Sequence, residues 1–297
     1  MSTPRLTARI WTLIIVLATV WGGSFLFARI AVLEIPPITL VFLRVALAAL
    51  ALNLLLLFRK NDYVHSRTMW LNFAAMGTLN NIIPFGLIFY GQLEIGAGLA
   101  AIINAMTPIW TVIFANFWTS DEKFTTAKII GVILGFIGVA VLIGSSMKDG
   151  LQASTIGQLA VLGATISYGV AGVFGRRFAA VPPVETARGQ LTMSSILILP
   201  LVVLIDQPWT LALPSQAAIW SVIALAIVCT AYAYLLFFKI LAEAGAVNVS
   251  LVTFLVPPSA IIFGMVVLGE QLELRHVVGL GIILAGLIVI DGRLLKR

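Results

Sequence analysis

The sequence predicts an all-α integral membrane protein of ten transmembrane helices, arranged as two inverted repeats of five helices each. Composition is the first observation that predicts it: 61% of the 297 residues are hydrophobic and only 10% are charged. A soluble domain carries roughly 45–50% apolar and about 25% charged residues. The other two observations are a series of long apolar runs and a repetition at half the chain length.

Apolar runs of about 20 residues recur from end to end, and each is long enough to cross a bilayer as a helix. Proline, glycine or charged residues separate them. The first run, Ile10 to Ala28, is too long for a signal-peptide core and has no A-x-A cleavage site, so we predict a transmembrane helix there. We place the ten spans at 10–29, 38–58, 69–91, 96–118, 127–146, 156–175, 187–205, 216–239, 246–268 and 276–292.

Lysine and arginine are distributed unequally between the two sides of these spans. Of the 18 basic residues, Arg44 lies inside a span, three lie on one side and 14 lie on the other. The positive-inside rule therefore predicts a multi-pass protein of the inner membrane with both termini in the cytoplasm. The net charge of +6 follows from this topology, and we expect no nucleic-acid partner. The residues on the basic side are Arg5, Arg9, Arg59, Lys60, Arg67, Lys123, Lys128, Arg176, Arg177, Arg188, Lys239, Arg293, Lys296 and Arg297; Arg29, Lys148 and Arg275 are on the other.

A set of proline, glycine and glutamate landmarks occurs twice in the same order. Five spans per copy is an odd number, so the second copy enters the membrane from the opposite face, as in an inverted repeat. We predict two repeats, residues 1–148 and 149–297. The paired landmarks are Pro36–Pro37 with Pro182–Pro183, Glu94 with Glu243, Gly96 with Gly245, Pro108 with Pro257, and Glu122 with Glu270.

Spans 5 and 10 are rich in glycine and carry almost no polar side chains. Small residues allow transmembrane helices to pack closely. We therefore expect a structural role for these glycines, which are Gly131, Gly135 and Gly138 in span 5 and Gly279, Gly281 and Gly286 in span 10.

Several other spans carry polar or aromatic side chains in mid-membrane, where an unpaired polar group is costly. Hydrogen bonding between helices is one explanation. The other is a substrate site near the midplane, because the residues occur in corresponding spans of the two halves. The candidate substrate-binding residues are Trp21, Ser24, Asn80, Asn81, Phe85, Tyr90, Asn104, Thr107, Tyr168, Tyr232, Tyr234 and Ser250.

Prolines inside spans 3, 4 and 9 interrupt helical hydrogen bonding. Pro84 removes the donor for the carbonyl four residues earlier, at Asn80, which is then free to face a cavity. Pro108 and Pro257–Pro258 are expected either to bend during transport or to form static kinks.

The twelve acidic residues all lie in loops or at span ends. A proton-coupled antiporter for cations usually needs an acid near the membrane centre, as proton carrier and counter-ion. We therefore expect a zwitterionic or neutral substrate, held by aromatic faces and by amide or hydroxyl groups. Downhill facilitation, or coupling by a route without a buried carboxylate, remains open.

Arg44 is the one basic residue inside a span. It can snorkel to the interface or stabilise helix ends, or it can bind a carboxylate near the outer mouth. Arg188 in span 7 follows its proline pair at a shorter distance, so the two repeats differ here and the second interpretation is weakened.

The motifs resemble those of the drug/metabolite transporter superfamily, specifically its EamA-type ten-helix exporters. They are "WGGSF" in span 1, the short proline link, the arginine of span 2, "TP" in span 4, "PP" in span 9 and the acids before spans 5 and 10. Within this family the chain looks most like the YddG-type exporters of aromatic and other amino acids. The resemblance implies a basket-like bundle in which spans 1, 3, 4, 6, 8 and 9 enclose a central cavity and spans 5 and 10 lie at the back.

The function predicted from these features is a secondary transporter that exports small amphipathic metabolites, in particular aromatic or apolar amino acids, by alternating access. The alternatives are an exporter of other drugs or metabolites in the same fold and, in a different class, a passive channel. Two histidines, one cysteine and peripheral acids do not favour an enzyme, a metal site or a bound cofactor. The expected partners are a small-molecule substrate and membrane lipid, and a monomer is sufficient.

Overall fold

The computed structural model describes residues 7–57, 66–120, 122–144 and 152–291, and the described residues form helices and no strands. The predicted repeat boundary between residues 148 and 149 lies outside the described residues. The same holds for several cations of the topology argument, namely Arg5, Arg59, Lys60, Lys148, Arg293, Lys296 and Arg297.

Nine helical segments in the described part of the chain are long and apolar enough to cross a membrane, and predicted span 9 corresponds to a shorter apolar helix, Val252–Leu268. The first half comprises α1 (Ala8–Val32), α2 (Pro37–Leu57), α3 (Arg67–Gly77) with η1 (Thr78–Ile82) and α4 (Ile83–Gly91), α5 (Ala97–Asn104) with α6 (Thr107–Trp118), and α7 (Thr126–Gly144).

The second half has the same order of spans. It comprises α8 (Ala153–Phe174) with η2 (Gly175–Phe178), α9 (Pro183–Leu201) with η3 (Val202–Asp206), the turn η4 (Pro208–Thr210), α10 (Gln216–Ile223) with η5 (Ala224–Tyr232) and α11 (Ala233–Ala244), α12 (Ala246–Val249), α13 (Val252–Leu268) and α14 (Leu274–Asp291).

Helix starts follow ordinary capping chemistry. Helices α2 and α9 begin at Pro37 and Pro183, as the repeated proline pairs predict, because proline lacks the N–H that a first helical residue leaves unused. The hydroxyls of Thr7 and Ser215 accept hydrogen bonds from the first turns of α1 and α10.

Spans 3 and 8 are wound as π-helices at corresponding places. Segment η1 lies in the middle of span 3, and the 149-residue offset between Glu94 and Glu243 maps it onto residues 227–231, inside η5. Pro84 explains η1, because its ring and missing N–H disturb the turn before it. In η5, which has no proline, the Thr230 hydroxyl donates to the carbonyl of Leu225, five residues earlier (2.7 Å). Such π segments occur frequently at functional sites.

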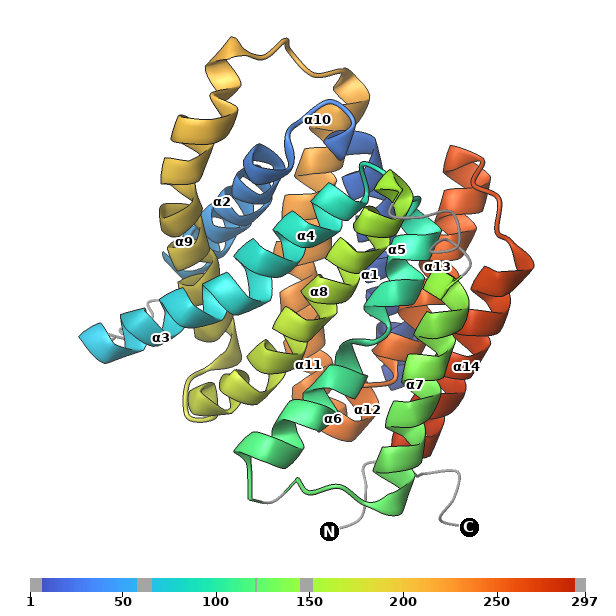
Figure 1. Ribbon diagram of the computed structural model, residues 1–297. Coiled ribbons are helices and arrows are strands. Elements are labelled where there is room, and N and C mark those ends of the chain that lie inside the picture. The colour runs from blue at the N-terminus through green and yellow to red at the C-terminus, as the bar shows by residue number, and fades with distance from the viewer. Residues whose placement is uncertain (1–6, 58–65, 121, 145–151, 292–297) are drawn as a thin grey trace.

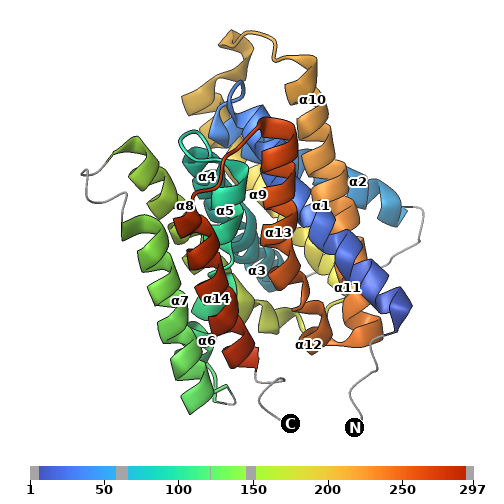
Figure 2. The ribbon, with the colours of Figure 1, turned by 90° about the vertical axis from the view of Figure 1, so that its right-hand side faces the viewer.

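Helices α7 and α14 form a closely packed pair at one side of the bundle (Figures 1 and 2). Gly131 faces Gly286, and Gly138 faces Gly279. The backbone carbonyl of each glycine lies so close to its partner that a Cβ on the partner would clash with it. The prediction of a packing role for these four glycines is confirmed. Gly281 differs, because a Cβ placed there would contact nothing within 4 Å.

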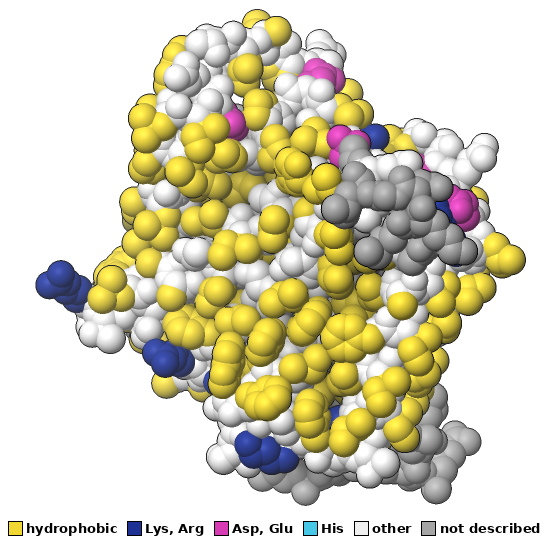
Figure 3. Space-filling model, in the orientation of Figure 1, with side chains coloured by type: hydrophobic (Ala, Val, Ile, Leu, Met, Phe, Trp, Pro, Cys, Tyr) yellow, Lys and Arg dark blue, Asp and Glu magenta, His cyan; other side chains and the backbone are white. Residues whose placement is uncertain are grey.

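Charged groups concentrate at the two ends of the bundle. We call the end where α1 begins and α14 ends the lower end, and the opposite end the upper end (Figure 2). On the face drawn in Figure 3, hydrophobic side chains cover the middle, lysine and arginine lie mainly toward the lower end, and aspartate and glutamate lie toward the upper end. This distribution is the one expected for a protein crossing a membrane with its lower end in the cytoplasm.

One upper contact makes stability depend on pH. The Glu34 carboxylate, in the α1–α2 link, accepts hydrogen bonds from the hydroxyl and the N–H of Ser215 at the start of α10, both at 2.6 Å. The side-chain hydrogen bond, and then the backbone one, lower the pKa of Glu34. Because the pKa of Glu34 is lower in the folded state, this contact stabilises the fold fully above about pH 4.3, the ordinary pKa of glutamate. The stabilisation is lost as the pH falls through the lower pKa of the folded state.

We therefore expect the melting temperature of the wild type to fall more steeply on acidification than that of Glu34→Ala, which lacks the titrating contact. The measurement is a melting series in detergent from neutral pH to below pH 4. Parallel curves for the two proteins would show that this contact does not contribute.

Candidate substrate site

A cluster of polar side chains lies at mid-height between the two halves of the chain. Asn80 of η1 donates from its amide nitrogen to Gln190 Oε1 of α9 (3.2 Å) and to the Tyr234 hydroxyl of α11 (3.1 Å). Both acceptors belong to the second half. Because Tyr234 accepts from Asn80, its own hydroxyl proton is available to another acceptor.

Arg44 of α2 reaches the same region. Only 7% of the residue is exposed, and its Nε donates to the hydroxyl of Thr230 in η5 (3.0 Å). The guanidinium carbon lies 3.8 Å from the centre of the Phe85 ring, a cation–π contact. The phenol groups of Tyr168 and Tyr234 lie near the guanidinium. Arg44 thus joins α2 to these residues of spans 3, 6 and 8, deeper than the outer mouth where a carboxylate-binding role was expected.

We name this set the central cluster: Arg44, Asn80, Phe85, Tyr168, Gln190, Thr230 and Tyr234. Its members come from five spans of the first and second halves. Of the predicted candidates, it contains Asn80, Phe85, Tyr168 and Tyr234.

Asn81 has a different role from its neighbour. It is fully buried, and its amide nitrogen donates to the Ser194 hydroxyl of α9 (3.0 Å), which in turn donates to the carbonyl of Gln190 (2.7 Å). Asn81 therefore ties span 3 to span 7, which is the helix-packing interpretation of a mid-span polar residue.

Four further candidates lie in the interior but are not part of the central cluster. The Trp21 ring packs on Phe237 at 5.7 Å between centroids, and the Ser24 hydroxyl donates to the carbonyl of Trp21 (2.7 Å). Asn104 and Thr107 flank the break between α5 and α6. Their side-chain oxygens, Oδ1 and Oγ1, are buried and have no hydrogen-bond partner among the described residues.

Three candidates are not brought to this region. Tyr90 and Tyr232 are 49% and 48% exposed, and Ser250 is an exposed residue in the turn between α12 and α13. Tyr232 continues a stripe of exposed residues on span 8, including Trp220 and Val228, so it faces the lipid side of the helix. Tyr232 and Tyr234 are two positions apart and point to nearly opposite faces, so they cannot both face the central cluster.

Gln190 and Thr230 were not among the sequence-based candidates, although both are buried polar residues in apolar spans. The family resemblance implies a cavity lined by spans 1, 3, 4, 6, 8 and 9, whereas Gln190 lies in span 7. Both residues can be identified from the sequence by their polarity alone, because any amide or hydroxyl in the middle of the membrane needs a hydrogen-bond partner.

The upper ends of the two halves are joined by a carboxylate. Glu270 follows α13, and its oxygens accept hydrogen bonds from the N–H groups of Ala97 (2.6 Å) and Gly98 (2.9 Å), at the start of α5. Gly96 and Gly264 leave room for the carboxylate, which a Cβ at either position would meet. Negative charge at a helix start is favourable. We call this contact the Glu270 latch, and it holds α5 against α13.

A second connection closes the upper end between α1 and α4. Arg29 donates to the carbonyl of Gln92, and the Gln92 amide donates to the carbonyl of Phe25 (2.9 Å). A pocket of about 560 Å³ lies beside these contacts, lined in part by Arg29, Glu270 and His276.

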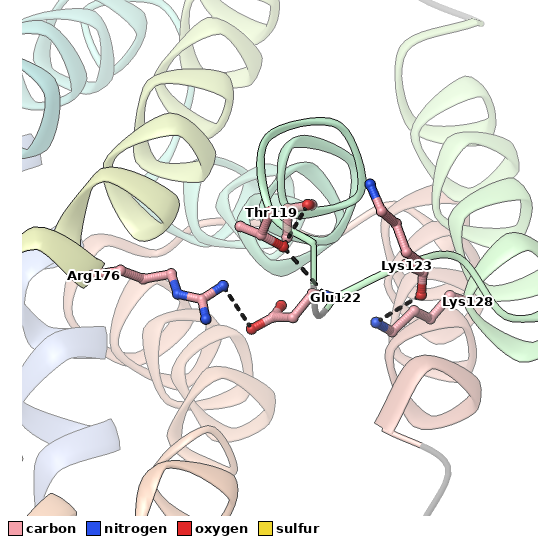
Figure 4. A network of polar contacts seen from close by, with 6 residues as sticks. Thr119, Glu122, Lys123, Lys128 and Arg176 are labelled. Carbon is pink, nitrogen blue, oxygen red and sulfur yellow. Dashed lines mark hydrogen bonds and ion pairs between the residues drawn. The ribbon is translucent and has the colours of Figure 1, made fainter.

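The lower end lacks the equivalent of the latch in the described residues. Glu122, the repeat partner of Glu270, has half of its side chain exposed and lies 3.8 Å from Arg176 (Figure 4). Helix α6 packs on α7 and α8, whereas α12 packs on α11, and Figure 2 shows α6 and α12 apart. A pocket of about 520 Å³, lined by Trp118, Phe174 and Arg177 among others, opens between α6 and α8. Neither this pocket nor the upper one is lined by a residue of the central cluster.

Two five-span halves, broken helices in spans 4 and 9, and a polar cluster where the halves meet define a multi-pass membrane transporter. The sequence profile described as "EamA-like transporter family" matches residues 9–144 and, a second time, 155–291. The chain belongs to the EamA-like transporter family, and its substrate is therefore a small molecule.

Curated relatives agree with this assignment. The chain is 24% identical over 279 residues to the protein named "Uncharacterized transporter YoaV" of Bacillus subtilis, covering 92% of this chain and 94% of that protein. It is 25% identical over 278 residues to "Uncharacterized inner membrane transporter YedA" of Escherichia coli K12, covering 91% and 87%. A solved crystal structure matches with a TM-score of 0.69 at 19% identity, covering 98% of this chain and 99% of that one, which shows the shared fold.

Proposed function

We propose that this protein is a secondary transporter that exports small amphipathic metabolites, in particular aromatic or apolar amino acids, across the inner membrane. The lower end faces the cytoplasm, so both termini are cytoplasmic, and one chain is sufficient. The observation that carries the proposal is the central cluster, whose side chains come from both halves and meet at mid-height, where inverted-repeat transporters bind substrate.

The contrast between the two ends supports alternating access. The Glu270 latch and the Arg29–Gln92 contact close the upper end, whereas Glu122 and the lower halves of spans 4 and 9 make no matching contact in the described residues. This arrangement fits a state that receives substrate from the cytoplasm. Release to the outside then requires the latch to open and the lower ends to approach each other.

The chemistry of the central cluster supports an amphipathic substrate without net positive charge. It offers two tyrosine rings, Phe85, amide groups and one guanidinium, and contains no carboxylate. The one buried acid among the described residues, Glu185, pairs with Arg188 (2.8 Å) in the first turn of α9, at the lower end. A cationic drug would therefore meet Arg44 without a counter-ion.

The test is flux from proteoliposomes that contain only this protein, loaded with labelled amino acids. We expect saturable efflux down the substrate gradient without an ion gradient. Asn80→Ala removes two hydrogen bonds of the central cluster, each worth about 0.5–1.5 kcal/mol, and should lower the flux roughly five- to 150-fold. Tyr232→Phe is the matched control, since this tyrosine lies on the outer surface of the bundle and should transport normally.

Other outcomes would change the proposal in defined ways. Flux that does not saturate and is not reduced by competing substrates would indicate a channel. Flux that begins only when a pH gradient is imposed would contradict the argument from the peripheral acids. An absence of amino-acid flux under either condition would refute the substrate class and leave the transporter fold.

A further inference from the structure

We propose that Arg44 is the group that binds a carboxylate of the transported molecule. The inference rests on the proposed transport function and specifies the substrate class of its site as molecules that carry a carboxylate. Four observations support it: burial, the absence of a counter-ion, the arrangement of the guanidinium donors and the neighbouring hydroxyls.

Arg44 is a buried cation without an opposite charge. It is 7% exposed, and none of its described contacts is with a carboxylate. Isolating a charge in the interior is unfavourable unless it is paired, and an ionisable residue inside the membrane is by default a candidate functional residue. Arg188, its approximate counterpart in the second half, is by contrast neutralised by Glu185 at 2.8 Å. An anionic group could therefore pair with Arg44 in the first half, whereas Arg188 in the second half already has a carboxylate partner.

The donors of Arg44 are partly used and partly free. Thr230 takes the Nε donor and Phe85 covers one face of the guanidinium, so these contacts fix its orientation. No described residue accepts a hydrogen bond from either terminal NH₂ group. Two parallel N–H donors on a fixed plane are suited to a carboxylate.

The neighbouring groups favour a single carboxylate over a phosphate. Arg44 is the one lysine or arginine of the central cluster, and one guanidinium balances one negative charge. The Tyr234 hydroxyl lies near the guanidinium and keeps its proton free, because Asn80 donates to its oxygen. A carboxylate at Arg44 would therefore also find a hydroxyl donor, and its apolar or aromatic remainder would find the rings of Phe85 and Tyr168.

A purely structural role for Arg44 is the competing explanation, since its bond to Thr230 ties α2 to η5. The two explanations predict different ligand selectivity. A structural tie affects the stability of the protein with any ligand, whereas a carboxylate-binding group makes affinity depend on the carboxylate of the ligand.

The experiment is ligand-dependent thermal stabilisation of the purified full chain, measured with three probes that share a phenyl ring. Phenylalanine carries a carboxylate and an ammonium, 3-phenylpropionate carries the carboxylate alone, and phenethylamine carries the ammonium alone. We expect the wild type to be stabilised by both carboxylates and not by the amine. Arg44→Lys should weaken apparent carboxylate affinity roughly 10- to 100-fold, the value of a charge-assisted hydrogen bond. Arg67→Gln, an exposed charge removed at the start of α3, is the control and should behave as the wild type.

The ligand comparison on the wild type tests the proposal even if Arg44→Lys does not fold. The proposal would be overturned if phenethylamine stabilised the wild type as much as the two carboxylates do. It would also be overturned if neither carboxylate stabilised the protein. An Arg44→Lys protein that folds and keeps wild-type carboxylate affinity would likewise overturn it. Carboxylate-selective binding without flux in proteoliposomes would instead refute the transport function and leave this site standing.

Discussion

Gly286→Ala is expected to lower the stability of the protein by about 1–3 kcal/mol, the usual cost of overpacking a close contact. A Cβ at this position would lie 2.6 Å from the Gly131 carbonyl oxygen and 3.1 Å from the Gly135 nitrogen, both in the backbone of α7. Backbone atoms cannot move aside as a flexible side chain can, so α14 would have to separate from α7 along its length. The measurement is the melting temperature in detergent.

Gly281→Ala provides a matched control on the same helix. A Cβ there meets nothing within 4 Å, so the added methyl group causes no clash. Alanine is favoured over glycine inside a helix by up to about 1 kcal/mol, so this variant should be as stable as the wild type or more stable. Equal losses for both variants would mean that α14 tolerates no alanine for reasons other than its contact with α7.

Glu270→Ala is expected to open the upper end of the bundle. The change removes two charge-assisted hydrogen bonds to the N–H groups of Ala97 and Gly98, each worth about 1.5–3 kcal/mol. Loss of even one such bond would raise the population of the open state about tenfold or more. Cys229, the single cysteine of the chain, is 2% exposed, and its thiol donates a hydrogen bond to the carbonyl of Val20 in α1 (3.2 Å). It precedes Thr230 of the central cluster, so it serves as a native reporter of access to this region.

The measurement is the rate at which a membrane-impermeant thiol reagent modifies Cys229 from the outside. We expect slow modification of the wild type and a rate at least about tenfold higher in Glu270→Ala. The control is Glu273→Ala, which removes a nearby carboxylate that pairs instead with Arg275 (2.7 Å) in the same segment. Equal rates for Glu270→Ala and the wild type would show that the latch does not control the upper end.

The sequence predicts those features of the fold that depend on composition and order. Apolar length sets the spans, and the proline pairs mark the starts of α2 and α9. Glycine spacing marks the α7–α14 contact, because close packing in a membrane depends on small residues. Even so, span 9 is not continuous: α12 ends at Val249 and α13 begins at Val252, ahead of the Pro257–Pro258 pair where the sequence placed the bend.

The direction in which side chains point is harder to read from this sequence. A membrane helix is apolar on nearly every face, so its pattern of polarity does not reveal which face turns inward. In span 8 the nine-residue π segment also departs from the 3.6-residue period on which such a reading depends. The sequence therefore predicts both Tyr232 and Tyr234 as site residues, although Tyr232 faces outward in the structure. The sequence predicts Arg44 near the outer mouth, because sequence position gives the depth of a Cα atom and not the reach of a long side chain.

Sequence repetition also cannot show where two equivalent residues differ. Glu122 and Glu270 occupy matching positions in the two repeats, but they make different contacts in this conformation. Glu270 is engaged with α5, and Glu122 is half exposed at the α6–α7 link. The difference belongs to the conformation and not to the composition of either half.

The pairing of polar groups across the two halves has a consequence for the order of synthesis. Arg44 donates to Thr230, Asn80 donates to Gln190 and Tyr234, and Asn81 donates to Ser194. The N–H groups of Ala97 and Gly98 likewise donate to Glu270 of the second half. The ribosome delivers the N-terminal half first. During that interval the guanidinium of Arg44 and the amides of Asn80 and Asn81 are in the membrane without their final partners. Their hydrogen bonds form only when the spans of the second half have been inserted. Truncation after the first repeat should therefore leave a half that resembles a client of membrane chaperones and proteases more than a stable domain.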